Sequence, residues 1–305
     1  MLKKKEEQTT GKNIGKNMCK IEQKLQRKHL IALSFFLPLL VMTGCCIAFG
    51  VQPFGDNSLL IIDGLHQYMP FYSVLYDKLK GGDPLFYSFR SGLGINFLSL
   101  FSYYLSSPFN LLILFFKKSQ LNMAVSMIIV LKIACSGMTA GIYFSSKSKK
   151  QGFSTVMISM AYALSSYMVG YCWNVMWLDA IMIFPIIMMG LERLIEKKDG
   201  RLYCIALFYA LYCNYYIAFM ICIFAVIWYL LYSFKSIKQF FFRGIAFAFY
   251  SFLAAGMAAI LLIPAYMGIK QTASGETMQL PEHSFLTSAA DLLNRQFALW
   301  SPISH

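Results

Sequence analysis

Long apolar runs alternate with short polar stretches along most of the chain. Residues 30–51 carry no charged side chain and are long enough to cross about 30 Å of hydrocarbon as one helix. The further apolar runs lie at residues 96–116, 121–145, 153–172, 178–192, 202–234 and 242–263. This pattern predicts an all-α polytopic membrane protein.

Two of these runs do not read as single straight spans. Residues 96–116 hold a Ser-Ser-Pro sequence at 106–108 and Asn110 near their centre, and polar groups with a proline suit a broken interfacial segment better than a span. The run 202–234 is long for one helix, and we predict a break near Asn214 that divides it into two short helices.

The positive charges favour both breaks. If 96–116 crossed the membrane and 202–234 were one helix, the basic clusters at 147–150 and 193–201 would both lie outside, against the positive-inside tendency. With both breaks, every main basic cluster lies inside, together with the nine Lys and Arg of residues 1–28. We therefore predict about seven transmembrane helices and a cytoplasmic N-terminus.

The predicted organisation has five parts. They are a basic, disordered cytoplasmic tail at 1–28, a first transmembrane helix at 29–51, an extracytoplasmic loop with interfacial helices at 52–120, six further transmembrane helices at 121–263 and an extracytoplasmic segment at 264–305. Within the loop, apolar residues recur at helical spacing from His66 to Leu79, which predicts a folded loop rather than a disordered one.

Composition narrows the function classes. Hydrophobic residues make up 58% of the chain and charged residues 13%, against about 25% charged in a typical soluble domain. The net charge of +13 would suit nucleic acid, but the basic residues cluster between apolar runs, where they set topology, so we expect no nucleic-acid partner. The eight cysteines and four histidines show no metal-ligand or disulfide spacing.

Asp63 is the first candidate functional residue. It follows the apolar residues 59–62 and precedes Gly64, at a point where the chain turns away from the membrane. A poorly hydrated carboxylate there could accept a proton from a substrate hydroxyl or hold a divalent cation. The structural alternative is an N-cap for the following helix, and the alternative for His66 is an ordinary interfacial histidine.

Three further charged residues lie in unusual places. Arg90 is the main unpaired cation of its part of the loop and could bind a phosphate, although a flexible Gly-x-Gly turn beside it is the alternative. Lys132 lies in mid-span, where a cation costs about 2.5–3.5 kcal/mol, so it should face the bundle interior, a water-filled cavity or an anionic ligand. Asp179 lies at the start of the fourth span. It could face a cavity there, and the structural alternative is that its charge complements the helix dipole.

Several sequence blocks in one order resemble a known family. The blocks are Asp63-x-x-x-Gln67-Tyr68-x-Pro70-Phe71, Ser91-Gly92-Leu93-Gly94-x-Asn96, Tyr103-Tyr104-x-x-Ser107-Pro108-x-Asn110 and Trp177-Leu178-Asp179, with Lys132 and Asn214-Tyr215-Tyr216. From about residue 55 to 265 the chain resembles the bacterial YfhO family of membrane proteins.

The resemblance implies the N-terminal part of a GT-C-type glycosyltransferase. Such an enzyme would transfer a sugar from a polyprenyl-phosphate donor to a cell-envelope polymer, such as the lipoteichoic acid of Gram-positive bacteria, on the outer face, with membrane lipid around it. By this analogy Asp63 is the catalytic base or a metal-binding carboxylate, Arg90 and Lys132 bind the donor phosphate, and Asp179 is a second polar wall. The remaining substrate-binding residues would be His66, Gln67, Tyr68, Asn96, Tyr103, Tyr104, Trp177 and Asn214.

The one candidate cofactor is a divalent cation. Members of the family are much longer, so we expect this chain, which ends at His305, to be an N-terminal portion.

Two other functions stay open. A non-catalytic membrane scaffold or partner subunit is one alternative. A transporter of lipids or sugar-lipids is the other, and it would usually show two repeated halves, which the sequence lacks.

Overall fold

A computed structural model describes residues 27–90, 94–147 and 152–270. The predicted disordered tail up to residue 26, Gly92 and the segment after residue 270 lie outside these ranges. Within them the chain is almost entirely helical, and the one sheet is a short antiparallel hairpin of β1 (Tyr87–Ser88) and β2 (Ile95–Asn96).

The all-α polytopic fold is confirmed. Among the described residues, five helices are long and apolar enough to cross a membrane. They are Arg27–Ala48, α4 (Leu121–Lys147), the pair α5 (Phe153–Ala163) and α6 (Ser166–Gly170), α7 (Val175–Lys197) and α10 (Ile237–Lys270). Two further apolar helices, α8 (Arg201–Cys213) and α9 (Tyr215–Leu231), are shorter than these five, and the seven spans that the sequence predicts include both of them.

The predicted break in the run 202–234 is confirmed. Helix α8 ends at Cys213 and α9 begins at Tyr215, with Asn214 in an extended conformation between them. The Asn214 side chain caps α9 by accepting a hydrogen bond from the backbone N–H of Ile217 at 2.9 Å. The 13 residues of α8 span only about 20 Å, so this helix is short for a bilayer core.

The run 96–116 is also broken, as predicted. Helix α3 (Phe97–Tyr104) and the 3₁₀ helix η2 (Pro108–Phe115) meet at a bend of 101°. The Ser107 hydroxyl accepts from the backbone N–H of Phe109 at 3.3 Å, and Pro108 has no N–H to leave unpaired at the start of η2. Neither half is long enough to cross a membrane, and we refer to residues 97–115 as the bent pair.

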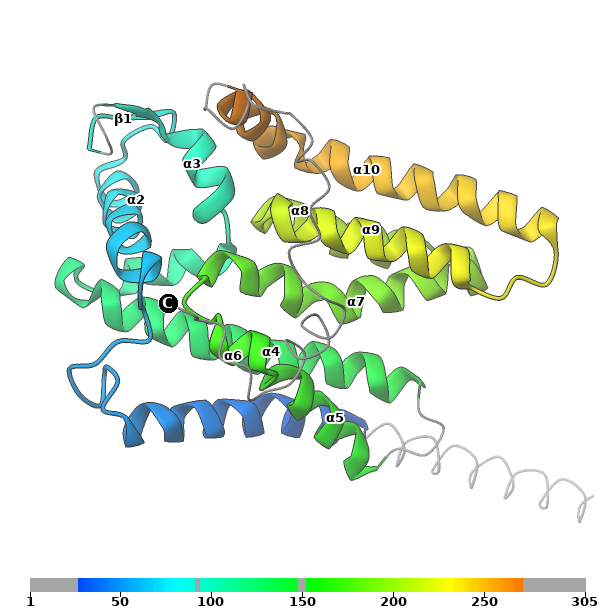
Figure 1. The fold of residues 1–305 in the computed structure, drawn as a ribbon, viewed down its shortest axis with the longest axis horizontal. Helices are drawn as coiled ribbons and strands as arrows, with labels where there is room; N and C mark the ends of the chain where they lie inside the picture. Colours follow the sequence, from blue (N-terminus) through cyan, green and yellow to red (C-terminus); the bar gives the residue numbers. More distant parts are fainter. Residues whose placement is uncertain (1–26, 91–93, 148–151, 271–305) are drawn as a thin grey trace, which may run out of the picture.

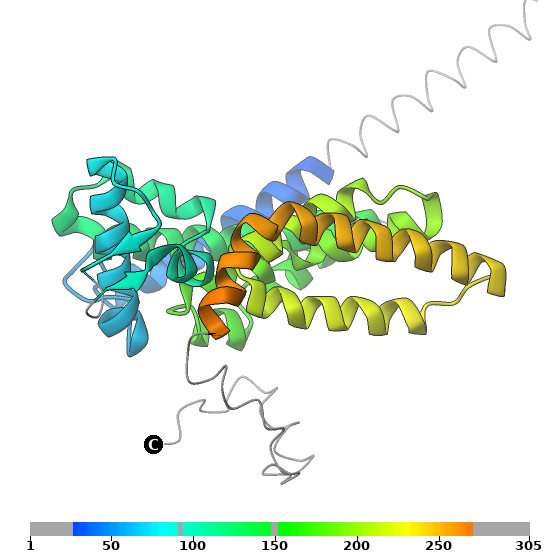
Figure 2. The ribbon, with the colours of Figure 1, turned by 90° about the horizontal axis from the view of Figure 1, so that it is seen from above.

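The short elements between the first helix and α4 gather at one end of the bundle. The π-helix η1 (Gly64–Tyr68), α2 (Met69–Gly81), the β1–β2 hairpin and the bent pair all lie there, together with η3 (Lys118–Gln120) (Figure 1). We call this the loop end, and the end with the α7–α8 and α9–α10 connections the opposite end. Figure 2 shows the loop-end elements as a layer set apart from the long helices.

Two packed regions hold the bundle together. One lies under the loop end and includes Tyr72, Phe97 and Leu178, whereas the other joins α7, α8, α9 and α10. Helices α7 and α8 approach so closely that a Cβ on Gly190 would lie 2.4 Å from the Tyr203 backbone nitrogen. Many apolar side chains of α9 and α10 point outward, among them Phe252 at 78% exposure, as expected of helices that face lipid.

Helix α10 bends over the loop end in its last turns (Figure 2). Pro264 lies inside this helix, where a proline removes a backbone hydrogen bond and allows a kink. The Ser99 hydroxyl of α3 donates to the Pro264 carbonyl at 2.8 Å. The last turns of α10 therefore brace α3.

Candidate functional site

Asp63 stands on a constrained turn at the loop end. The preceding residue, Ile62, has a φ of 49°, a left-handed conformation that a β-branched residue adopts only under strain. The next residue, Gly64, is packed against Leu60 and Trp173, where a Cβ would lie 3.2 and 3.4 Å from their side chains. Packing around Gly64, and the hydrogen bond from the His66 N–H to the Ile62 carbonyl at 3.0 Å, therefore hold the backbone around Asp63.

The N-cap interpretation of Asp63 is wrong. The residue occupies the N-cap position of η1, but its φ of −61° and ψ of −29° are already helical and its side chain caps no backbone N–H. Asp63 and His66 are both exposed, so the carboxylate is also better hydrated than the sequence led us to expect. The Asp63 carboxylate remains available to a ligand.

Aromatic rings from three segments form a continuous group beside Asp63. The ring centroids of Tyr68 and Tyr104 lie 5.4 Å apart, those of Tyr103 and Tyr104 4.6 Å apart, and those of Tyr103 and Tyr215 5.4 Å apart. We call these four tyrosines the aromatic wall. Burial, the neighbouring Tyr104 and the charge of Asp63 raise the pKa of Tyr68 well above its ordinary value of 10, so its hydroxyl stays protonated.

Hydrogen bonds fix the position of the wall. Tyr68 donates to the Asn174 side-chain oxygen at 2.8 Å, and Gln67 donates to the Tyr104 hydroxyl at 3.2 Å. The Asn214 amide donates to the Tyr103 carbonyl at 3.2 Å. The structure thus brings the predicted residues Gln67, Tyr68, Tyr103, Tyr104 and Asn214 together near Asp63, whereas the half-buried Trp177 packs on the ring of Tyr216, with centroids 6.3 Å apart.

Arg90 lies in a different place from Asp63. Its guanidinium pairs with Asp77 on α2, and Lys118 donates to the same carboxylate oxygen at 2.6 Å, so the prediction that Arg90 is unpaired is wrong. The hydrogen bond from Lys118 and the two positive charges hold the pKa of Asp77 below its ordinary value. Asp63 and Asp77 are fourteen residues apart on continuous helix, a separation of about 20 Å.

The hairpin beside Arg90 is anchored from α2. The buried Lys78 ammonium donates to the carbonyl oxygens of Pro84 and Tyr87 at 2.7 and 2.8 Å. Asn96 ends β2 and caps α3 by accepting from the Ser99 N–H at 3.3 Å. In this arrangement Asn96 has a structural role, and Arg90 lies too far from Asp63 to share one small ligand with it.

Lys132 and Asp179 form an ion pair inside the bundle. The Lys132 ammonium lies 2.6 Å from Asp179 and donates to the Val175 carbonyl at 3.0 Å, and both charged side chains are 0% exposed. The other Asp179 oxygen accepts from the hydroxyls of Ser107 at 2.8 Å and Tyr209 at 2.9 Å. Lys132 thus faces the bundle interior, as predicted.

This network joins four segments. Lys132 belongs to α4, Asp179 to α7, Ser107 to the bent pair and Tyr209 to α8. Asp179 lies one turn inside α7, which starts at Val175, so its charge meets Lys132 rather than the helix start that the sequence suggested. Through the hydrogen bond from Ser107 to Asp179, the network links the bend of residues 97–115 to the long helices α4 and α7.

Further buried hydrogen bonds hold the bent pair. Tyr72 on α2 donates to the Asn110 side-chain oxygen at 2.9 Å, and the Asn110 amide donates to the Leu105 carbonyl at 3.0 Å. The Ser106 hydroxyl donates to the Cys213 carbonyl at 3.0 Å. The same bend carries Tyr103 and Tyr104, so these bonds also position the aromatic wall.

A family model described as "Bacterial membrane protein YfhO" matches residues 34–299. The chain belongs to the YfhO family. The resemblance seen in the sequence is therefore confirmed, and the match extends beyond residues 55–265 on both sides. Neither the curated proteins nor the solved structures include a match to the chain.

The sequence blocks that resemble the YfhO family lie in two separate parts of the structure. Asp63, Gln67 and Tyr68 lie together with Tyr103 and Tyr104 at the loop end, whereas the blocks around Ser107 and Asp179 form the buried network. Sequence reasoning missed Tyr72, Asn174 and Tyr209 as partners of these blocks. No local pattern marks those three residues, because each acts through a contact distant in sequence.

The described residues around Asp63 do not form a preorganised metal site. In the ranges that the structure describes, no three His, Cys, Asp or Glu side chains lie together in an arrangement that could hold a metal ion. A divalent cation at Asp63 would need further oxygen ligands from a bound phosphate or from outside these ranges.

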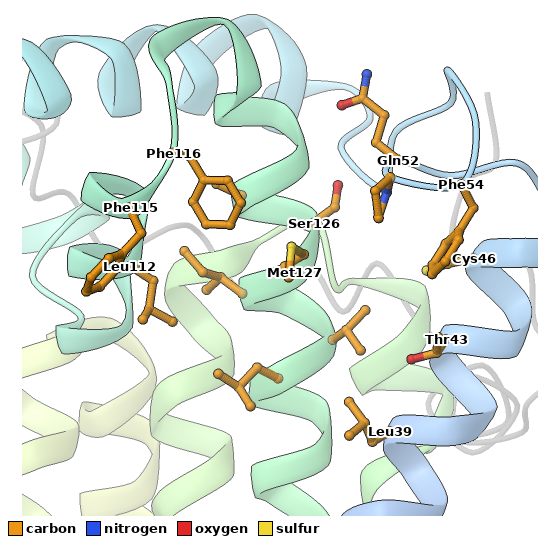
Figure 3. Close-up of a pocket in the computed structure, with 15 residues that line it drawn as sticks. Leu39, Thr43, Cys46, Gln52, Phe54, Leu112, Phe115, Phe116, Ser126 and Met127 are labelled. Atoms are coloured by element: carbon orange, nitrogen blue, oxygen red, sulfur yellow. The ribbon is translucent and has the colours of Figure 1, made fainter.

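An apolar cavity of about 430 Å³ opens beside the first helix. Figure 3 shows it between Leu39, Thr43 and Cys46 of that helix, Met127 of α4, and the loop residues Gln52, Phe54, Phe115 and Phe116. Its size is that of a typical small-ligand pocket. The hydroxyl of Ser126, which lines it, is buried without a hydrogen-bond partner among the described residues.

Proposed function

We propose that this YfhO protein is a membrane glycosyltransferase that moves a sugar from a polyprenyl-phosphate donor to a cell-envelope acceptor such as lipoteichoic acid. The observation that carries the proposal is the placement of Asp63. A free carboxylate on a constrained turn, beside a fixed wall of tyrosines, is the arrangement expected of a polar reacting group next to a surface on which a sugar ring can pack.

In the proposed reaction Asp63 accepts the proton of an acceptor hydroxyl. The hydroxyl oxygen forms a bond to the anomeric carbon of the donor sugar, and the bond from that carbon to the phosphate oxygen breaks, with its electron pair leaving on the phosphate. General-base assistance of this kind contributes about 10²–10⁴-fold to a rate. The Tyr104 hydroxyl accepts from Gln67 and keeps its own O–H free to donate beside the reacting groups, whereas the Tyr68 O–H donates to Asn174 and holds the wall in place.

Asp63 alone among the predicted charged residues is proposed to act on the substrate. Arg90 pairs with Asp77, which lies about 20 Å from Asp63 along the helix, and Lys132 is enclosed with Asp179, so neither shares the site of Asp63. In this proposal the Lys132–Asp179 pair positions the wall through Ser107. The donor's hydrocarbon tail lies in the apolar cavity of Figure 3.

The proposal also assigns an orientation. The basic connections at 193–201 and 235–243 and the end of α4 near Lys147 all lie at the opposite end, so that end is cytoplasmic by the positive-inside tendency. The loop end and Asp63 then face the outside, and the N-terminus lies in the cytoplasm. Labelling of single cysteines in intact cells tests this: a cysteine at Asp83 should react with an impermeant reagent and one at Lys198 should not.

The functional test is glycosylation of envelope polymers in a bacterial host whose own YfhO gene has been deleted. The native chain, Asp63→Asn and the control Asp56→Asn are compared at equal membrane abundance. Asp56 is an exposed carboxylate of the same loop outside the proposed site. We expect the native chain and Asp56→Asn to restore the sugar and Asp63→Asn to fail. Equal restoration by all three would overturn the assignment, favouring a scaffold or transporter.

A further inference from the structure

The opposite end of the molecule contains a second, strongly basic pocket. Its cavity of about 540 Å³ lies between the end of α7 and the start of α10. The lining residues are Lys198, Ser236, Lys238, Gln239, Phe242, Arg243 and Ala246. Three of the seven carry a positive charge and none carries a negative charge.

Within the described residues, the cations of this pocket have no carboxylate partners. None of the four ion pairs within the described ranges includes Lys198, Lys238 or Arg243. The two acidic residues nearest to Lys198 along the chain are engaged elsewhere: Glu196 accepts from Tyr232 at 3.3 Å, and Asp199 accepts from the Arg201 N–H at 3.3 Å. By contrast, Lys147 at the same end pairs with Glu192 at 2.6 Å.

The pocket presents hydrogen-bond donors rather than acceptors. The Ser236 oxygen accepts from the Gln239 N–H at 3.2 Å, and the Gln239 side-chain oxygen accepts from the Lys235 N–H at 3.2 Å. These caps leave the Ser236 O–H and the Gln239 NH₂ free to donate. The Arg243 Nε is buried and has no hydrogen-bond partner among the described residues.

The backbone holds Lys198 at the rim of the pocket, and the start of α10 adds to the attraction for an anion. Lys198 ends α7 in a left-handed conformation with a φ of 64°, and its N–H bonds to the Leu194 carbonyl, which fixes the residue at the rim. Helix α10 begins at Ile237, and its first turn contains no acidic residue. The positive end of this helix dipole therefore adds to the charges of the side chains.

One side of the pocket is apolar and continues along the lipid-facing surface of α10. Phe242 lines the cavity and is 64% exposed, and Phe241 and Ile245 beside it are 62% and 69% exposed. A ligand that satisfies both sides needs an anionic group with several oxygen atoms joined to hydrocarbon. Basic pockets between transmembrane helices bind the headgroups of anionic phospholipids in this way.

We propose that this pocket binds the phosphate headgroup of an anionic phospholipid, with the acyl chains along Phe241, Phe242 and Ile245 of α10. The site lies at the end of the bundle away from Asp63, and the proposal does not depend on the sugar-transfer reaction. Lys198 and Lys238 contact the phosphate from the rim, and Arg243 contacts it from the pocket floor.

The test measures lipid binding to the purified full chain in mild detergent, by native mass spectrometry and by thermal stabilisation. The probes are phosphatidylglycerol, phosphatidylcholine and inorganic phosphate. The pocket variant carries Lys198→Ala with Lys238→Ala, both exposed positions. The matched control carries Lys197→Ala with Lys235→Ala, which removes the same charge from exposed residues of the same two connections outside the lining set.

We expect phosphatidylglycerol to bind more tightly than phosphatidylcholine, and the pocket variant to lose about thirtyfold in affinity for it. The control should bind within about threefold of the native chain. Equal binding of the two lipids, or equal losses in the two variants, would overturn the proposal in favour of unspecific charge attraction. Inorganic phosphate that binds as tightly as phosphatidylglycerol would overturn it in favour of a free-phosphate site.

Discussion

The buried Lys132–Asp179 pair allows a quantitative prediction. Replacing Asp179 by Asn keeps the shape of the side chain but leaves the Lys132 ammonium at 0% exposure with neutral acceptors and no negative charge beside it. Removing one partner of a buried ion pair typically costs about 3–5 kcal/mol, because an uncompensated charge remains inside the protein. We expect the free energy of unfolding to fall by that amount.

The opposite substitution should cost less. In Lys132→Met, the Asp179 carboxylate keeps its hydrogen bonds from Ser107 and Tyr209 at 2.8 and 2.9 Å, so its charge stays partly compensated. The double variant Lys132→Met with Asp179→Asn removes both charges and keeps an acceptor for the two hydroxyls. It should be more stable than Asp179→Asn alone, with a coupling free energy of about 1–3 kcal/mol.

Equilibrium unfolding in mixed micelles, followed by tryptophan fluorescence, measures these values. Ser126→Ala is the matched control, because Ser126 is another buried polar residue of α4 whose hydroxyl has no hydrogen-bond partner in the described part of the chain, and its loss should not destabilise the protein. Strictly additive single-variant effects, or an Asp179→Asn protein as stable as the native chain, would refute the reasoning. The same variants should loosen the aromatic wall, since Ser107 fixes the bend that carries Tyr104.

Three further predictions follow from the loop end and the cavity. Asp77→Asn should lower the free energy of unfolding by less than about 1 kcal/mol, because the ion pairs of Asp77 with Arg90 and Lys118 are partly exposed. In the native chain this contribution should be present above the ordinary pKa of 3.8 and disappear as the pH falls through the lower folded value, as acid unfolding of the two proteins would show. Asn214→Ala should lose about 1–3 kcal/mol in thermal unfolding, since it removes the α9 cap and the bond to Tyr103. Met127→Trp should fill the apolar cavity and slow sugar transfer with no loss of thermal stability; unchanged transfer would exclude the cavity as the tail site.

Local sequence signals predicted much of this fold. The Ser-Ser-Pro sequence at 106–108 and Asn214 mark chain breaks through their own side chains, and the structure breaks at both places. The mid-span position of Lys132 predicted that it faces the bundle interior, a water-filled cavity or an anionic ligand, and the structure pairs it with Asp179 in the bundle interior.

The pairings distant in sequence could not be read from the chain. Lys132 and Asp179 are separated by 47 residues, Tyr68 and Asn174 by 106, and nothing local to either residue identifies the other. Arg90 looked unpaired because its partner Asp77 lies on a helix whose placement against the hairpin depends on tertiary packing. The same packing separates Arg90 from Asp63, which the family resemblance assigned to one substrate site.

The most direct test of the account is sugar transfer in isolated membranes that carry Asp63→Asn, Asp63→Glu, Asp56→Asn or the native chain at equal abundance. Asp63→Asn should lower the rate at least about 100-fold with unchanged thermal stability, Asp63→Glu should retain part of it, and Asp56→Asn should match the native chain. A rate for Asp63→Asn within about threefold of the native rate would contradict the claim that the Asp63 carboxylate takes part in the chemistry.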